Sequence, residues 1–377
     1  MRNVKALVQA LTLVTALTMW YPTRAPAADF DVDGSMFSVN GFGTVGAVHS
    51  SDDKADFTAT AFEPNGAGYS RSWSASVDSL IGAQVTANPT PRFSAVLQLI
   101  VQQNYDNSYS PHVEWANIKY APGPNWVVRV GRSILPSFER SDSLYVGYTL
   151  PWIRLPDEIR FSNSATHSDG IDVLYRLTTG ALTQNLRAQW GHSAEEYPVV
   201  AFRTKDLRVL SDTLQYGDTS VHLSYQAMNW TAQYTSPLRS APPGRFWLAS
   251  AGFTYDPGTW FVTGDSNYAH YDTLGDLNAW YLSTGVRLGR FTPYVVDSSA
   301  RKPTPGNPPA QLMSAGDGHT VAAGVRWDFA SNLDLKLQLQ RVSLDSDRLP
   351  ASFVNLQPGV RASDKADVAS VALDFVF

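Results

Sequence analysis

Seven charged residues in one polar stretch, residues 133–169, have the types and spacing to act on a passing solute: Glu139, Arg140, Asp142, Arg154, Asp157, Glu158 and Arg160. Both signs lie close together along this stretch. Opposite charges that face each other across a narrow passage create a transverse field, which orients polar solutes and tunes ion preference. The alternative is that these are ordinary surface-loop charges with no selective role.

Seven basic residues form a second set of candidates for the lining of a passage: Arg129, Arg132, Arg176, Arg187, Arg287, Arg326 and Lys336. They stand in or beside segments where polar side chains alternate with apolar ones. This set is all basic, whereas the stretch 133–169 carries both signs. Together the two sets favour a passage that tolerates anions or accepts both signs, with plain structural charge as the alternative reading of each residue.

Patterns that support catalysis or metal binding are missing from the sequence. The absence of cysteine excludes disulfides, thiolate metal sites and cysteine nucleophiles. The seven histidines contain no pair at i, i+2 or i, i+4, and neither Gly-x-Ser-x-Gly nor His-Glu-x-x-His occurs. The stretch "GFGTVG" (41–46) matches a dinucleotide-binding pattern, but it lies within a predicted strand with no helix after it. We interpret its glycines as packing positions, and we expect no cofactor, no metal and no enzyme activity.

The first 27 residues have the three regions of a signal peptide. Arg2 and Lys5 precede an apolar run, and Ala25-Pro26-Ala27 provides an Ala-x-Ala cleavage site. The run is about 15 residues long, which is shorter than the roughly 20 that a membrane-spanning helix needs. Removing Arg2, Lys5 and Arg24 leaves 26 basic residues against 34 acidic ones, a net charge of −8. Nucleic-acid binding is disfavoured, since phosphate recognition needs basic surfaces.

Alternation of apolar and polar residues is the main structural signal in residues 28–377. In "NLDLKLQLQ" (332–340), four leucines share one face, and Asp334, Lys336, Gln338 and Gln340 share the other. Period-two alternation predicts strands whose two faces meet different environments. Sixteen such segments occur: 38–49, 72–87, 92–103, 112–120, 125–132, 170–177, 182–192, 219–227, 230–235, 245–255, 260–268, 277–288, 291–297, 319–329, 332–344 and 366–377.

The connections between these segments alternate strictly between short and long. Seven are turn-sized, at 88–91, 121–124, 178–181, 228–229, 256–259, 289–290 and 330–331. Eight are long and polar, at 50–71, 104–111, 133–169, 193–218, 236–244, 269–276, 298–318 and 345–365. An even number of strands with tight turns at one end and long loops at the other is typical of an outer-membrane barrel. We therefore predict an all-β protein, a single closed antiparallel transmembrane barrel with lipid-facing apolar residues and a water-filled polar lumen.

Aromatic residues stand beside every predicted short turn, as a girdle at one membrane interface requires. They are Phe93, Tyr120 with Trp126, Tyr175, Trp230, Tyr255 with Trp260, Phe291 and Phe329. The alternative is that aromatic residues are simply common in strands. Their placement at one end of each segment favours the barrel.

The two ends of the mature chain resemble Gram-negative general porins. "FSVNGFGTVGAV" (37–48) is similar to the first strand of these porins, and "VALDFVF" (371–377) is similar to their last strand, which ends in Phe. The resemblance implies export to the outer membrane, a homotrimer, and recognition of Phe377 by the barrel-assembly machinery. It also implies a third loop that folds into the pore, although the Pro-Glu-Phe-Gly motif of many general porins is missing from residues 133–169. The path of this loop is therefore left open.

The leading functional hypothesis is a porin that lets ions and small hydrophilic solutes diffuse passively across the outer membrane, surrounded by its lipids. A substrate-specific, anion-preferring channel is the first alternative, and the inward arginines are its support. An outer-membrane barrel enzyme of the phospholipase or protease type is the second, and it would need a serine, histidine and carboxylate placed at the rim. A soluble periplasmic β protein is the last.

Overall fold

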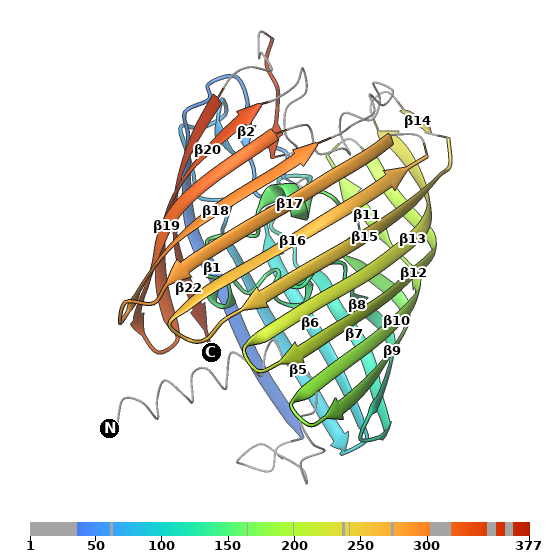
Figure 1. Cartoon of the computed structure of the whole chain (residues 1–377). Helices are drawn as coiled ribbons and strands as arrows, with labels where there is room; N and C mark the ends of the chain where they lie inside the picture. Colours follow the sequence, from blue (N-terminus) through green and yellow to red (C-terminus); the bar gives the residue numbers. More distant parts are fainter. Residues whose placement is uncertain are drawn as a thin grey trace.

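The chain forms one closed antiparallel barrel of tilted strands (Figure 1). The computed structural model describes residues 36–60, 63–163, 165–198, 200–235, 238–240, 242–272, 275–301, 318–344, 352–358 and 365–377. The predicted signal peptide, residues 1–27, lies outside this part. None of the described helices is long and apolar enough to cross a membrane.

Sixteen long strands make the wall, each paired with its neighbours in chain order, and the first and last strands pair to close it. They are β1 Phe37–Ser50, β5 Leu80–Thr90, β6 Phe93–Gln102, β7 His112–Gly123, β8 Trp126–Ile134, β9 His167–Thr179, β10 Leu182–His192, β12 Val200–Tyr216, β13 Thr219–Thr235, β15 Gly244–Tyr255, β16 Trp260–Tyr271, β17 Gly275–Val286, β18 Phe291–Arg301, β19 Gly318–Ala330, β20 Leu333–Leu344 and β22 Lys365–Val376. The predicted fold class and strand number are confirmed.

Shorter elements lie in the loops. The short strands are β2 Asp56–Phe57, β3 Ala67–Gly68, β4 Trp73–Ser74, β11 Ala194–Tyr197, β14 Leu238–Ser240 and β21 Phe353–Val354. The helices are η1 Ser141–Ser143, η2 Gly147–Thr149 and α2 Asp157–Arg160. All three helices belong to the loop between β8 and β9, residues 135–166, which we call L3.

The alternating pattern places side chains as the sequence predicts. In β20, Leu337 and Leu339 are exposed on the outer face, whereas Asp334 and Lys336 are fully buried inside the barrel. The outer face consists of apolar side chains, which would be unstable in water and are stable in lipid. This outer apolar surface is therefore the membrane-facing wall.

Aromatic pairs gather at the end of the barrel that carries the short turns. Exposed rings stack or pack edge-on across neighbouring strands there: Phe93 with Tyr120, Trp126 with Tyr175, Tyr255 with Trp260, Phe291 with Trp327, and Phe375 with Phe377. Their amphipathic edges suit the lipid–water boundary. The predicted aromatic girdle is present, but Trp230, which was predicted to belong to it, lies elsewhere.

The predicted turn at 228–229 is wrong, and one strand lies elsewhere. β13 runs without a break through Met228 and Asn229, which pair with Phe246 and Arg245. The missing strand is β12, inside the predicted loop 193–218, and a bulge between Lys205 and Arg208 interrupts its alternation. A bulge adds one residue and shifts which side chains face inward, so the period-two pattern disappears from the sequence.

This correction also moves the aromatic residue assigned to that turn. Trp230 is buried near the loop end of β13, and exposed Tyr216 stands beside the real turn at residues 217–218. The predicted segment 72–87 differs as well. It splits into β4 and β5, because residues 75–79 belong to the first loop.

The last strand closes the barrel against the first. Phe377 and Gly41 exchange two backbone hydrogen bonds, of 2.8 and 2.9 Å. A Cβ atom on Gly41 would lie 2.1 Å from the Phe377 ring, and one on Gly43 would lie 2.5 Å from Phe375. The glycines of "GFGTVG" are thus the packing positions that the sequence predicts.

Deletion of Phe377 is predicted to impair outer-membrane insertion more than it alters the pore of protein refolded in detergent. The reason is that the ring lies on the exterior, 62% exposed, and contacts the wall rather than the lumen. Membrane fractionation measures insertion, and heat-modifiable gel mobility measures the folded fraction. Phe291→Ala, which removes another exposed turn-end ring, is the matched control. Equal insertion of both variants would contradict the prediction.

Candidate pore lining and its two cavities

L3 folds into the barrel instead of covering its mouth, and Figure 1 shows its short helix inside the wall. Polar groups of the wall bind it from several sides. On β13, the Nε2 atom of His222 lies 3.1 Å from the Pro136 carbonyl oxygen, and the Ser224 hydroxyl donates to the Ser137 carbonyl. On β16, the Asn267 amide donates to the Ser162 hydroxyl at 2.6 Å. The inward path left open by the sequence is thus settled.

Arg154 fastens L3 to the opposite wall. Its guanidinium donates to both carboxylate oxygens of Asp78, at 2.8 and 2.6 Å, and also reaches Gln340 and Ser370. Its charge also lies 5.1 Å from the centre of the Phe57 ring. Buried arginines need this degree of pairing, because an unpaired buried charge is costly. Arg154 therefore joins L3, the first loop and two wall strands.

Lys336 and Arg326 fasten the η2 segment of L3. The Lys336 ammonium donates to the Gly147 carbonyl at 2.7 Å and to Asp374 at 2.8 Å. The Arg326 guanidinium donates to the carbonyl oxygens of Tyr148 and Leu150, at 2.6 and 3.0 Å. These cations thus supply hydrogen-bond donors to backbone carbonyls that water would otherwise have to satisfy.

An apolar core packs L3 against the inner face of β13–β19. L3 contributes buried residues that include Phe138, Leu150, Trp152 and Ile159. The wall contributes buried side chains that include Trp230, Phe246, Phe261, Tyr281, Tyr294 and Val296. The prediction of a purely polar lumen is wrong on this side, because protein replaces water there.

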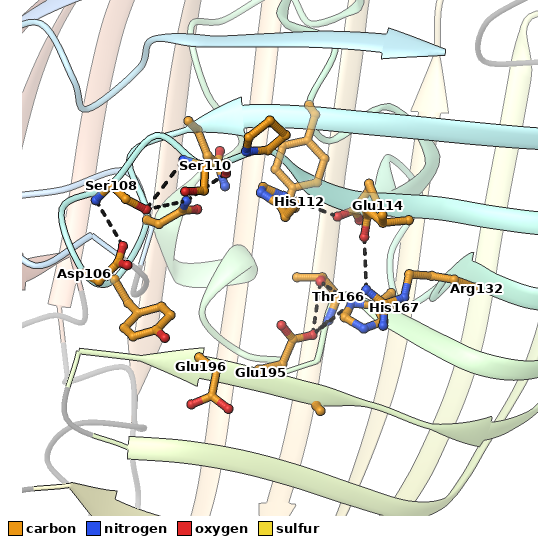
Figure 2. A pocket seen from close by; sticks show the side chains of 17 residues that line it. Asp106, Ser108, Ser110, His112, Glu114, Arg132, Thr166, His167, Glu195 and Glu196 are labelled. Carbon is orange, nitrogen blue, oxygen red and sulfur yellow. Dashed lines mark hydrogen bonds and ion pairs between the residues drawn. The ribbon is translucent and has the colours of Figure 1, made fainter. Parts of the chain in front are cut away.

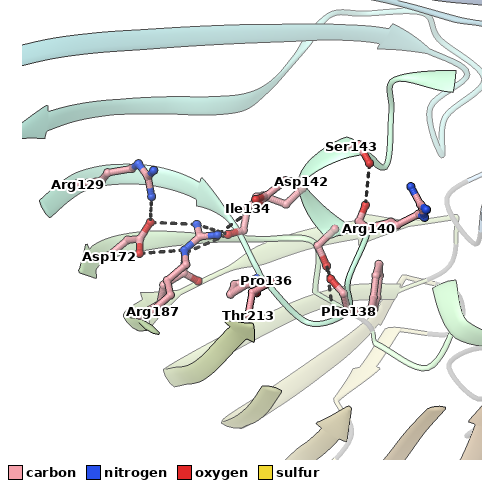
Figure 3. A network of polar contacts seen from close by, with 12 residues as sticks. Arg129, Ile134, Pro136, Phe138, Arg140, Asp142, Ser143, Asp172, Arg187 and Thr213 are labelled. Carbon is pink, nitrogen blue, oxygen red and sulfur yellow. Dashed lines mark hydrogen bonds and ion pairs between the residues drawn. The ribbon is translucent and has the colours of Figure 1, made fainter. Parts of the chain in front are cut away.

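A charged network runs along the inner wall toward L3 (Figure 3). Asp172 binds two arginines, at 2.6 Å to Arg129 and 2.9 Å to Arg187. Arg187 also donates to the Ile134 carbonyl at 3.1 Å and pairs with Asp142 of L3 at 3.4 Å. Asp142 is about one-third exposed. The network ends at the surface of a cavity, where a charge can meet a solute.

That cavity opens at the turn end of the barrel and has a volume of 270 Å³. Glu139, Arg140, Asp142 and Ser143 of L3 line one side. The wall side is polar and comes from β10, β12, β13 and β15: Asn185, Arg187, Ser211, Thr213, Gln215, Ser220, His222 and Thr254. The sequence-predicted pair Glu139 and Asp142 is thus brought together with Arg140 and Arg187.

A second cavity, of 370 Å³, lies at the loop end (Figure 2). Its charged lining residues are Asp106, His112, Glu114, Arg132, His167, Glu195 and Glu196. Tyr145 of L3 also borders it. Residues 141–145 therefore border both cavities, with Ser143 at the turn-end cavity and Tyr145 at the loop-end one.

The other predicted residues lie away from these two cavities. Arg160 is half-buried, with its charge 6.0 Å from the Tyr145 ring centre. Arg287 pairs with Asp256 at 2.6 Å in the turns of the rim. A side-chain nitrogen of Arg176 is buried with no hydrogen-bond partner among the described residues.

Two acidic L3 residues, buried Glu158 and half-buried Asp157, lie outside the membrane-spanning strands. Glu158 accepts hydrogen bonds from Ser298 and Thr320, at 2.9 and 2.6 Å. Burial raises the pKa of Glu158, and it raises the pKa of Asp157 to about 8, because desolvation disfavours the charged carboxylate. Neither residue lines the two cavities.

Several cavity residues were not among the sequence candidates. Glu114 is the extra residue of a bulge in β7, between the pairs Gln98–Trp115 and Leu99–Val113. Because the bulge adds one residue to the strand, Glu114 does not fit a strict period-two pattern. Asp172, which lines neither cavity but pairs with Arg129 and Arg187, stands at an inward position of β9, so a search for acids at inward positions would have found it. In the described part of the chain, no group of three or more His, Cys, Asp or Glu residues is arranged to hold a metal ion.

Replacement of Lys336 by Met is predicted to destabilise the barrel by about 3–5 kcal/mol, because it leaves Asp374 buried without its cation. The measurement is unfolding in urea of protein folded in detergent. Arg341→Ala is the control, since the Arg341–Asp367 pair lies on the exposed surface and is screened by water. A Lys336 variant as stable as this control would contradict the role given to Lys336.

Comparison with known proteins finds similarity at the level of structure. No protein-family model and no curated sequence matches the chain. The anion-selective porin of Comamonas acidovorans is 14% identical, with a TM-score of 0.55 over 90% of this chain and 100% of the porin. The outer-membrane channel DcaP of Acinetobacter baumannii is 12% identical, with a TM-score of 0.56 over 90% and 97%.

The outer-membrane protein OmpT of Vibrio cholerae is 10% identical, with a TM-score of 0.56 over 91% of this chain and 98% of OmpT. At these identities the comparison concerns the fold. The apolar outer wall, the aromatic girdle and the closed pairing of β1 with β22 agree with it. The chain is therefore a closed transmembrane β-barrel with the fold of outer-membrane porins.

Proposed function

We propose that the chain is an outer-membrane channel for ions and small hydrophilic solutes, which pass residues 141–145 of L3 along the wall formed by β7–β13. The observation that carries this proposal is a pair of cavities with polar and charged lining residues, both bordered by residues of that segment, inside one closed barrel. A sixteen-strand barrel encloses enough space for water. The porin fold of the compared structures supports the same role.

The proposed passage is narrow, because protein fills much of the barrel. L3 packs its apolar core against β13–β19. The first loop adds a second apolar core, in which Phe57 and Val77 belong to the same cluster as Val342 of β20 and Phe353 of β21. Solutes would move through the remaining polar side, and this narrowness favours selective over wide-open diffusion.

Cations are the proposed preferred ions. The predicted wall bases Arg129, Arg187, Arg326 and Lys336 each have a carboxylate partner, so they do not offer a free positive charge. The loop-end cavity has four carboxylates, Asp106, Glu114, Glu195 and Glu196, and one arginine, Arg132, which pairs with Asp169. This proposal of cation preference replaces the anion preference that the sequence suggested from its inward arginines. The role we propose is transport without catalysis.

Planar-bilayer recordings are expected to show stepwise conductance with a reversal potential that favours cations. Asp142→Arg places a positive charge in the turn-end cavity and is expected to move the reversal potential toward anions. Asp367→Asn removes a carboxylate from the exposed surface and is the control. Folded protein that gives no conductance steps would contradict the channel. Equal reversal potentials for wild type and Asp142→Arg would contradict the proposed path.

We also propose a homotrimer. One structure of V. cholerae OmpT, 12% identical with a TM-score of 0.54, is a trimer form. Sedimentation of protein folded in mild detergent, with the bound detergent subtracted, is expected to give three times the monomer mass. A monomer mass at all protein concentrations tested would contradict the trimer.

A further inference from the structure

We propose that the loop-end cavity is a binding site for small organic cations that carry primary ammonium groups. This inference rests on the proposed channel and names the class of solute that the channel would select. The site is built from β7, β9 and β11, with Tyr145 of L3 on one side (Figure 2). None of its acidic or histidine residues was singled out by the sequence.

Two buried atoms of the cavity lining lack hydrogen-bond partners. Glu114 is 2% exposed and His167 is 5% exposed, yet Oε1 of Glu114 and Nε2 of His167 have no hydrogen-bond partner among the described residues. Buried polar atoms are normally satisfied, so two unpartnered atoms that line one cavity are open to bond a molecule that enters it. Both side chains line the cavity and are drawn among its lining residues in Figure 2.

The missing partner is a hydrogen-bond donor. Nδ1 of His167 lies 3.1 Å from Oε1 of Glu195, and a carboxylate can only accept, so the ring hydrogen is on Nδ1. In the neutral ring Nε2 is then an acceptor, and the carboxylate oxygen of Glu114 is an acceptor as well. A primary ammonium has three N–H donors and a positive charge, which matches two acceptors and the acidic lining.

The bulge in β7 is what turns Glu114 toward this space. Glu114 is the unpaired extra residue between two ladder pairs, and bulges commonly re-aim a side chain beside a functional site. His112 approaches the other carboxylate oxygen, Oε2, at 3.9 Å, which leaves Oε1 open.

Other ligand classes match the cavity less well. An anion would need a cationic side chain with unused hydrogen-bond donors. Arg132 is the arginine of this cavity, and its two terminal nitrogens already donate to Asp169 at 2.7 Å and to the Val113 carbonyl at 3.0 Å. A bound metal ion would need three or more ligands, and no such group exists in the described part of the chain. Glu196 and Asp106 lie toward the mouth, where their charge would attract a cation from outside.

The test is titration calorimetry of the folded full chain in detergent with 1,4-diaminobutane as the probe. Wild type is expected to bind it, and Glu114→Gln is expected to raise the dissociation constant about tenfold, because a charge-assisted hydrogen bond is lost. Asp367→Asn, on the exposed surface outside both cavities, is the matched control and is expected to bind as wild type does. Glu195→Gln is the second variant if Glu114→Gln does not fold, and it is expected to weaken binding as well.

Uncharged 1,4-butanediol is expected not to bind. The inference is overturned if wild type does not bind the diamine, if the cavity variants bind it as wild type does, or if Mg²⁺ displaces it at equal concentration. Binding in detergent needs no conduction, so a failure of the proposed channel in bilayers remains separate from a failure of this site. In a conducting protein, the diamine is expected to reduce the current of wild type more than that of Glu114→Gln.

Discussion

The pairing of buried cations with L3 is the interaction on which the rest of the interior depends. A loop that crosses a barrel carries backbone carbonyls away from water, and each must find a donor. Lys336 and Arg326 provide these donors to Gly147, Tyr148 and Leu150, and Arg187 donates to Ile134 at the end of β8, where L3 begins. The carboxylates Asp374, Asp334 and Asp172 in turn hold the cations. Many charged residues that the sequence suggests as pore lining therefore hold L3 in place instead. By doing so they determine which part of the interior remains open.

The position of L3 divides the interior into two unlike halves. On the β13–β19 side, aromatic and aliphatic side chains pack against L3 as in the core of a soluble protein. The same core includes the loop-end parts of β12 and β13, and the two cavities with their polar and charged lining residues remain beside it. The same loop that fills one half thus shapes the passage in the other. Exposed charges such as Asp142 can act on a solute, whereas paired and buried ones such as Arg154 cannot.

Much of the wall was predictable from the sequence, because period-two alternation is a direct consequence of a barrel between lipid and lumen. β20 and β22 follow the pattern without exception, and their inward and outward residues are as expected. β12 was not predicted, because the bulge at Lys205–Arg208 breaks the alternating pattern. Glu114 was not identified as an inward residue, because a bulge in β7 breaks the pattern there as well. The pairing of Arg154 with Asp78 joins residues 76 positions apart and depends on how two loops meet, which alternation does not encode.

The central claim, that solutes pass beside residues 141–145 of L3, can be tested by a single cysteine. The chain has none of its own, so Asp142→Cys introduces a unique thiol at the turn-end cavity. Bilayer conductance is recorded before and after a charged, water-soluble thiol reagent is added, with lipid-facing Leu223→Cys as the control. The account predicts a lasting fall in the current of Asp142→Cys and none in the control. An Asp142→Cys channel that is fully modified and conducts as before would contradict it.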